Sequence, residues 1–331
     1  MSGRLDYLEP APGFGESRTL APGVEWLRLP LPFPPGHINV YRLEGDEGEP
    51  FLVDTGFAEE QTTVLWRDAC RRPRRAVVTH FHPDHIGQAA GLAAGGTEVH
   101  ISGPEWDKAR ALHELSGDRI DASIARFFAD NGMQGAYAPA RRGNGYRRSV
   151  PELPSSISVM EPGPLPFARG WNASFASGHS PAHALLFRAD NPVLAAGDVV
   201  LPRITPNISV WPDAPDADPL GDYLAALERL RALPGDTLVL PAHGLAFRGL
   251  HERLDGLAEH HAARLDELHD LLHRHGSCTA RTALPELFSR ELKPSSVPFA
   301  LGETLAHLNR LWLAGEAARE VDASGVWYYT R

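Results

Sequence analysis

The chain is poor in the residues that build disulfide frameworks, thiolate metal sites and basic binding surfaces. Its 331 residues include two cysteines, Cys70 and Cys278, which lie far apart in the sequence. That spacing excludes a disulfide framework and a cysteine-based metal site. Lysine occurs only at Lys108 and Lys293, and the net charge is −10. This charge argues against a general nucleic-acid binder, because such proteins are usually basic.

Long hydrophobic runs are also missing. No stretch reaches the ~18 apolar residues of a membrane helix, so we expect no membrane interaction. The first residues, Met1–Gly13, are polar and contain prolines, and they lack the apolar segment of a signal peptide. We therefore expect a cytoplasmic protein. Hydrophobic residues make up 43% and charged residues 22% of the chain, which is typical of folded globular proteins, and the length suggests about two domains.

Up to about residue 245, short apolar runs alternate with amphipathic patterns. This order predicts an α/β fold with the chemistry on loops that follow strands. Strands are expected at 24–29, 37–43, 50–53, 76–79, 98–102, 156–160, 174–176, 184–188, 192–196 and 237–240, and helices at 59–70, 88–94 and 220–233.

Residues 104–154 interrupt this pattern with two helical segments, 106–115 and 120–130, and an irregular stretch at 139–149. The insertion is too long for a simple strand connection, and we predict that it forms a lid. Its irregular stretch holds four arginines without an acidic neighbour: Arg141, Arg142, Arg147 and Arg148. They either bind an anionic group of the substrate or belong to a solvated loop, and the sequence leaves both open.

The last part of the chain has a different pattern. Leucines recur at spacings of three and four over residues 250–272, and helices at 283–292 and 302–313 precede two short strands at 319–330. We predict a catalytic domain over 1–245 and a winged-helix-like domain over 246–331. Residues 245–331 carry ten basic against twelve acidic side chains. This balance favours dimerisation or capping of the site over RNA binding, although RNA and a homodimer both stay open.

Histidine is abundant, with 16 residues, and one dense cluster follows a predicted strand. The segment Thr79-His80-Phe81-His82-Pro83-Asp84-His85 brings four metal-competent side chains within six residues. Two metal ions need such crowding, because each takes about three protein ligands and keeps one position open for water. A chance cluster of structural histidines is the alternative.

Three more candidates follow later predicted strands, each beside a glycine: His179, Asp198 and His243. Glycine lets the backbone turn sharply toward a common centre. Together with Asp54-Thr55-Gly56 after an early strand, this series resembles the metallo-β-lactamase superfamily. The resemblance implies an αββα sandwich with a dinuclear metal centre at one edge.

Carried over by motif, the resemblance implies a ligand set for each ion. His80, His82 and His179 would hold the first metal, Asp84, His85 and His243 the second, and Asp198 would bridge the two. Asp54 would orient a ligand loop. His183 is not expected to be a ligand, and its alternatives are a contact with substrate or a structural role.

The same resemblance implies a hydrolase in which a metal-bridging hydroxide attacks an ester, thioester or related acyl substrate, with Asp84 and Asp198 as catalytic residues. Zinc is the expected metal, and iron or manganese would also suit these ligands. The C-terminal pattern resembles the branch typified by β-lactamase-like protein 2, so an endoribonuclease or phosphodiesterase stays open. A third alternative is a non-catalytic metal-binding scaffold. The expected partner is a small-molecule substrate.

Overall fold

The computed structural model describes residues 5–69, 73–115, 117–136 and 145–331. They form two compact units, each assembled from separate stretches of chain. The first contains Met1–Glu114, Gly145–Pro206 and Arg231–Leu254, and the second contains Leu115–Asn144, Asn207–Leu230 and Asp255–Arg331. Because each unit combines three separate stretches, a single domain boundary cannot be read from this division. The predicted domain boundary near residue 245 and the predicted lid over residues 104–154 therefore stay predictions.

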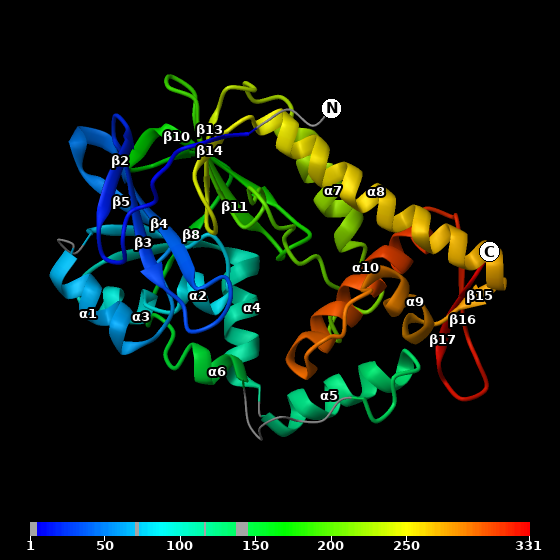
Figure 1. Cartoon of the computed structure of the whole chain (residues 1–331). Helices are drawn as coiled ribbons and strands as arrows, with labels where there is room; N and C mark the ends of the chain where they lie inside the picture. The colour runs from blue at the N-terminus through cyan, green and yellow to red at the C-terminus, as the bar shows by residue number, and fades with distance from the viewer. Residues whose placement is uncertain (1–4, 70–72, 116, 137–144) are drawn as a thin grey trace. The chain divides into compact units, whose positions relative to one another are not determined.

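Two seven-stranded sheets form the first unit and face each other (Figure 1). One has the order β2-β3-β4-β5-β6-β7-β8 and the other β1-β14-β13-β12-β11-β10-β9. The strands of the first sheet are β2 (Ser17–Ala21), β3 (Val24–Pro30), β4 (His37–Glu44), β5 (Pro50–Val53), β6 (Arg75–Val77), β7 (Glu98–Ser102) and β8 (Ser158–Met160). Those of the second are β1 (Asp6–Tyr7), β9 (Gly163–Leu165), β10 (Ala168–Ala176), β11 (His183–Arg188), β12 (Val193–Gly197), β13 (Leu238–Pro241) and β14 (Phe247–Arg248).

The inner strands of the first sheet are buried on both faces. Because successive side chains of a strand point to opposite faces, Trp26 and Phe51 join Trp171 in the core between the sheets. Their neighbours Leu27 and Leu52 join an apolar cluster on the other face. That cluster includes side chains of α1 (Glu60–Ala69) and α3 (Ala89–Ala94). The predicted α/β sandwich is confirmed.

Hydrogen bonds join the two sheets at the edge where several strands end. The Asn39 amide donates to the Ala242 carbonyl at 2.7 Å, and the Ala184 amide donates to the Thr79 carbonyl at 2.8 Å. Strands β5, β6 and β7 run parallel to one another, as do β12 and β13. The loops after β6, β12 and β13 therefore leave the sandwich on the same side.

The second unit contains α5 (Gly117–Asp130), α7 (Pro219–Leu230) and most of α8 (Leu250–His275). After α8 come β15 (Ser277–Cys278), α9 (Ala280–Leu287), α10 (Val297–Leu313), β16 (Ala318–Val321) and β17 (Trp327–Thr330). The three strands form one sheet in the order β15-β17-β16. In the described part of the chain, no helix has the length and apolar character that crossing a membrane requires.

Several predicted segments differ from the structure in their bounds; for example, the helix expected at 302–313 is α10, Val297–Leu313, and the strand expected at 174–176 is part of β10, Ala168–Ala176. The helix expected at 283–292 is α9, Ala280–Leu287, and Thr279 starts it through a capping box with Thr282. The stretch 139–149, expected to be irregular, contains the short helix α6 (Gly145–Ser149), whereas residues 137–144 lie outside the described residues. Short strands β1, β2, β9, β14 and β15 were not predicted, because their pairing partners, rather than a local pattern, define them.

Candidate metal centre

Three histidines from two loops aim ring nitrogens at one point. His80 and His82 follow β6, and His179 follows β10. The His80 Nε2 atom lies 2.8 Å from His82 Nδ1 and 3.3 Å from His179 Nε2, and the last two atoms are 3.1 Å apart. Two nitrogens that bind one zinc ion at about 2.1 Å lie about 3.0–3.4 Å apart. The two distances to His179 lie in this range and the His80–His82 distance is slightly shorter, so the three atoms are close enough to share one metal ion.

A second group lies beside the first. Asp84 and His85 belong to the short helix α2 (Pro83–Ile86), and His243 follows β13. The Asp84 Oδ2 atom lies 3.4 Å from His243 Nε2 and 3.8 Å from His85 Nε2. These three side chains form a second group whose ligand atoms are close enough to hold one ion.

Asp198, after β12, lies between the two groups. Its Oδ2 atom is 3.4 Å from His179 Nε2 and 3.6 Å from His85 Nε2, and its Oδ1 atom is 3.4 Å from His243 Nε2. Within the described residues, Asp198 Oδ1 and His85 Nε2 are buried without a hydrogen-bond partner. Buried polar atoms rarely lack a hydrogen-bond partner, and a bound cation would give both of these atoms a partner. The donor set therefore fits two divalent ions.

The electrostatics of the two groups are opposite. Burial, together with His179, lowers the pKa of His82 to about 3, and burial with His85 lowers the pKa of His80 well below its usual value. Burial also acts to lower the pKa of His243, but the Asp198 and Asp84 carboxylates raise it to about 10. His80 and His82 thus offer neutral imidazoles, which is the form that binds metal. In the second group, protons on histidine offset the carboxylate charge.

Asp54 has the geometry that the predicted orienting role requires. It is a non-glycine residue with a positive φ of 64°. Its Oδ1 atom accepts the Thr79 amide at 2.7 Å, and its Oδ2 atom lies 2.8 Å from His85 Nδ1. Because Asp54 occupies Nδ1, the Nε2 atom of His85 is left to face Asp84 and Asp198.

Three supporting contacts were not predicted from the sequence. The Nδ1 atom of His243 lies 2.9 Å from the His37 carbonyl, and the Gly244 amide donates to His37 Nε2 at 2.8 Å. The Thr79 hydroxyl lies 3.0 Å from His80 Nδ1. Such contacts fix the orientation of a metal-binding imidazole. The position of His37 at the start of a predicted strand gave only a weak signal for this role.

His183 has an internal role. Its ring is fully buried, its Nδ1 atom donates to the Ala184 carbonyl at 3.0 Å, and its Nε2 atom accepts the Asp198 amide at 3.1 Å. Both ring nitrogens are therefore used inside the protein. These contacts fit the structural role considered for His183, with its ring holding the Asp198 loop, and the substrate contact stays a prediction.

The four arginines are only partly described. Arg147 and Arg148 are exposed on α6, and Arg141 and Arg142 lie outside the described residues. Helix α6 is attached to the first ligand loop, because the Tyr146 hydroxyl donates to the Phe81 carbonyl at 2.8 Å. Phe81 stands between His80 and His82. The helix that carries two arginines is thus anchored beside the candidate metal centre.

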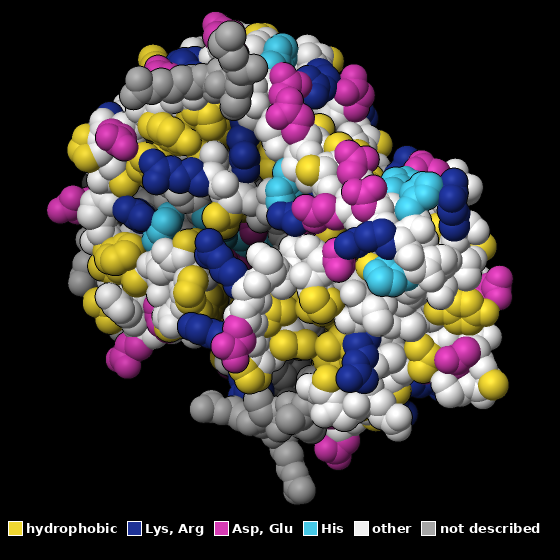
Figure 2. All heavy atoms as spheres, turned by 45° about the vertical axis from the view of Figure 1, so that its right-hand side comes forward, with side chains coloured by type: hydrophobic (Ala, Val, Ile, Leu, Met, Phe, Trp, Pro, Cys, Tyr) yellow, Lys and Arg dark blue, Asp and Glu magenta, His cyan; other side chains and the backbone are white. Residues whose placement is uncertain are grey.

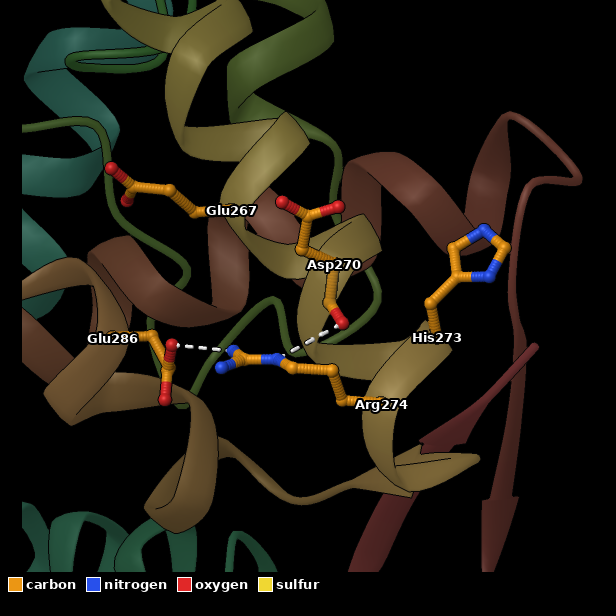
Figure 3. A pocket seen from close by; sticks show the side chains of 5 residues that line it. All are labelled: Glu267, Asp270, His273, Arg274 and Glu286. Carbon is orange, nitrogen blue, oxygen red and sulfur yellow. Dashed lines mark hydrogen bonds and ion pairs between the residues drawn. The ribbon is translucent and has the colours of Figure 1, made fainter.

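A separate pocket of about 470 Å³ lies in the second unit on α8 and α9 (Figure 3). Its lining residues are Glu267, Asp270, His273, Arg274 and Glu286. Arg274 donates to Glu286 at 2.8 Å and to the Asp270 carbonyl. Neither group of potential metal ligands in the described chain includes these residues. The histidine and aspartate cluster is the stronger candidate site.

Comparison with known families agrees with this architecture. Residues 33–243 match the model of the metallo-beta-lactamase superfamily. Residues 265–331 match a model described as the metallo-beta-lactamase-like C-terminal domain. The first match covers more than half of the chain and contains every predicted metal ligand. The protein belongs to the metallo-beta-lactamase superfamily.

Individual relatives extend the similarity over nearly the whole chain. A Bacillus subtilis (strain 168) protein, "Probable metallo-hydrolase YqjP", is 24% identical over 313 residues, which cover 86% of this chain and 91% of that protein. A beta-lactamase domain protein from Burkholderia ambifaria has a crystal structure that matches with a TM-score of 0.88 and 36% identity, over 99% of this chain and 97% of that one. TTHA1429 from Thermus thermophilus, a metallo-beta-lactamase family protein, matches with a TM-score of 0.79 and 28% identity, over 95% of this chain and 100% of that one.

Proposed function

We propose that this protein is a hydrolase that uses two divalent metal ions to cleave an ester, thioester or related acyl substrate. The observation that carries the proposal is the convergence of two adjacent ligand groups with Asp198 between them. His80, His82 and His179 would hold one ion, and Asp84, His85 and His243 the other. Bound ions of this kind supply an activated water at neutral pH and stabilise negative charge on the attacked group.

The chain's own residues would position these parts. Asp198 reaches toward both groups through its two carboxylate oxygens, and Asp84 adds a second carboxylate beside His243. Paired carboxylates reduce the repulsion between two nearby cations. Zinc suits a set rich in imidazole, and iron or manganese would also accept these ligands.

An RNA substrate is the second candidate. In its favour is the element order of the second unit, α8–β15–α9–α10–β16–β17 with one three-stranded sheet, which is the order we associate with a winged helix. The excess of acidic side chains in residues 245–331 opposes it. Figure 2 likewise shows acidic and basic side chains side by side over much of the face drawn.

The test has two arms on one purified sample. Elemental analysis is expected to find about two metal ions per chain, and a metal-free protein that does not take up zinc would contradict the proposal. A panel of thioesters, lactones, phosphodiesters, single-stranded RNA and a β-lactam then identifies the substrate class. Hydrolysis of an acyl substrate, abolished in His179→Ala, is the expected result. If the protein cleaves RNA and no acyl substrate, the second candidate function replaces the first.

A further inference from the structure

One buried carboxylate ties together the two loops that carry the first histidine group. Glu105 lies in the first turn of α4 (Gly103–Glu114) and is fully buried. Its Oε2 atom accepts the Phe81 amide at 3.1 Å. Its Oε1 atom accepts the Ser180 hydroxyl and the Ala182 amide, both at 2.6 Å. No motif in the sequence draws attention to this residue.

These partners are the direct neighbours of metal-ligand candidates. Phe81 stands between His80 and His82, and Ser180 follows His179. The loop around His179 has a further attachment to the end of β7, since the Ser102 hydroxyl donates to the Ala182 carbonyl at 2.9 Å. The carboxylate therefore fixes the distance between two loops that lie far apart in the sequence. No comparable contact in the described residues joins Glu105 to Asp84, His85 or His243.

We infer that Glu105 is a positioning residue that presets the three-histidine group for metal binding. The inference rests on the metal binding proposed above. A carboxylate suits this place because all three partners donate hydrogen bonds, and an ionised carboxylate only accepts. A glutamine at this position would replace one accepting oxygen with an NH2 group, which would then face another hydrogen-bond donor. Outer contacts of this kind typically contribute 10- to 100-fold to metal affinity.

The experiment measures zinc affinity for each group separately. His243→Ala removes a ligand of the second group, so the first group becomes the better zinc site. His179→Ala removes a ligand of the first group, so the second group becomes the better site. In each background, apo-protein competes for zinc with a chromophoric chelator, with and without Glu105→Gln. We expect Glu105→Gln to weaken binding 10- to 100-fold in the His243→Ala background and to leave binding unchanged in the His179→Ala background.

A matched control separates positioning from a general loss of stability. Glu303 is a largely buried carboxylate of the second unit that accepts a hydrogen bond from Asn207. Glu303→Gln is expected to leave both zinc affinities unchanged. Unchanged affinity in Glu105→Gln, or an equal loss in both backgrounds, would overturn the inference.

A milder variant keeps the test usable if Glu105→Gln does not fold. Ser180→Ala removes one of the three hydrogen bonds and leaves the carboxylate in place, so we expect a smaller loss confined to the first group. In that case unchanged zinc affinity in Ser180→Ala would overturn the inference. If the unmodified protein binds no zinc at all, the proposed function fails rather than this assignment.

Discussion

At the scale of single residues, the candidate ligands are oriented through their second ring nitrogen. Asp54 occupies Nδ1 of His85, the His37 carbonyl occupies Nδ1 of His243, and the Thr79 hydroxyl lies beside Nδ1 of His80. In each case the Nε2 atom is left to face the centre of the cluster. A fixed ring lowers the conformational entropy that metal binding would otherwise cost.

Asp198 gives the first prediction. Replacing it with alanine removes the carboxylate between the two groups, and we expect Asp198→Ala to lose the second metal first, because two nearby cations then repel each other without compensation. Metal content per chain after dialysis measures this. Asp190→Ala, at an aspartate whose side chain is 82% exposed, should retain both ions. Two ions and full activity in Asp198→Ala would contradict the bridging assignment.

Gly197 gives the second prediction. It has a φ of +49°, and a Cβ atom added there would lie 2.3 Å from Cε1 of His183. Gly197→Ala should therefore lower the free energy of unfolding by about 1–3 kcal/mol and displace the Asp198 loop. Denaturant unfolding checks the stability. Gly170→Ala, where an added Cβ meets nothing within 4 Å, is the control, and equal losses in the two variants would refute the packing argument.

At the scale of elements, α6 connects the arginine-rich stretch to the ligand loop through Tyr146. If the four arginines bind an anionic substrate, replacing Arg141, Arg142, Arg147 and Arg148 with glutamine should raise KM and flatten its salt dependence. Metal content should not change. Steady-state kinetics at several salt concentrations measures both effects.

A matched arginine controls for the change of surface charge. Arg126 on α5 is 84% exposed on its side chain and forms an ion pair with Asp130 in the next turn. Arg126→Gln should leave KM and its salt dependence unaltered. If the fourfold variant also keeps the parental KM for every substrate that the protein cleaves, the arginines belong to a solvated stretch.

The contact of α8 with α10 in the second unit predicts a pH dependence of stability. His261 and His307 are fully buried, and the Nδ1 atom of His261 lies 3.1 Å from the Nε2 atom of His307. Burial, together with His307, lowers the pKa of His261 to about 3, and burial lowers the pKa of His307 to about 4. A folded pKa below the unfolded value of about 6.5 means that the unfolded state gains protons first as the pH falls. Stability is therefore unaffected above about pH 6.5 and decreases below it.

A single substitution should remove part of this acid sensitivity. Each histidine that stays neutral in the folded state lowers the free energy of unfolding at pH 4.5 by about 3 kcal/mol relative to neutral pH, because pH 4.5 is two units below its unfolded pKa. His261→Gln keeps a donor toward His307 but cannot titrate, so it should lose less stability between pH 7 and 4.5. Chemical denaturation at both pH values measures the difference. His269→Gln, at a half-exposed histidine of α8, is the control and should behave like the parent.

At the scale of the whole molecule, every candidate metal ligand lies in the first compact unit. Metal that binds only the folded state stabilises it by about 4 kcal/mol at a free concentration a thousandfold above Kd. We therefore expect chelation to lower the Tm of the first unit by roughly 10 °C. The second unit should unfold at an unchanged temperature where calorimetry separates the two transitions.

The matching variant tests whether the shift arises at this centre. His82→Ala removes a ligand candidate of the first group, so chelation should change its Tm less than that of the parent. An equal shift in both proteins would indicate that the metal binds elsewhere. The absence of any shift in the parent would contradict metal binding.

The sequence by itself determined much of the local structure. Strand β7 occupies the predicted residues Glu98–Ser102, and β5 occupies the predicted residues Pro50–Val53. These strands were predictable because short apolar runs bounded by turn residues are typical of strands. The histidine and aspartate candidates were also visible, since each follows a strand beside a glycine or within the dense cluster. Side-chain type and spacing along the chain are local properties, and they identify which atoms can bind a metal.

Only the tertiary structure decided which residues hold those candidates in place. Glu105 bonds to a residue 77 positions away, and the His37 carbonyl meets His243 across 206 positions. No local pattern encodes such contacts, because they exist only after the two sheets have packed and brought their strand ends to one edge. The same packing places the buried His183 ring against the Asp198 amide, 15 positions away. The sequence thus determined the donor atoms, and the packing of the sheets determined their orientation.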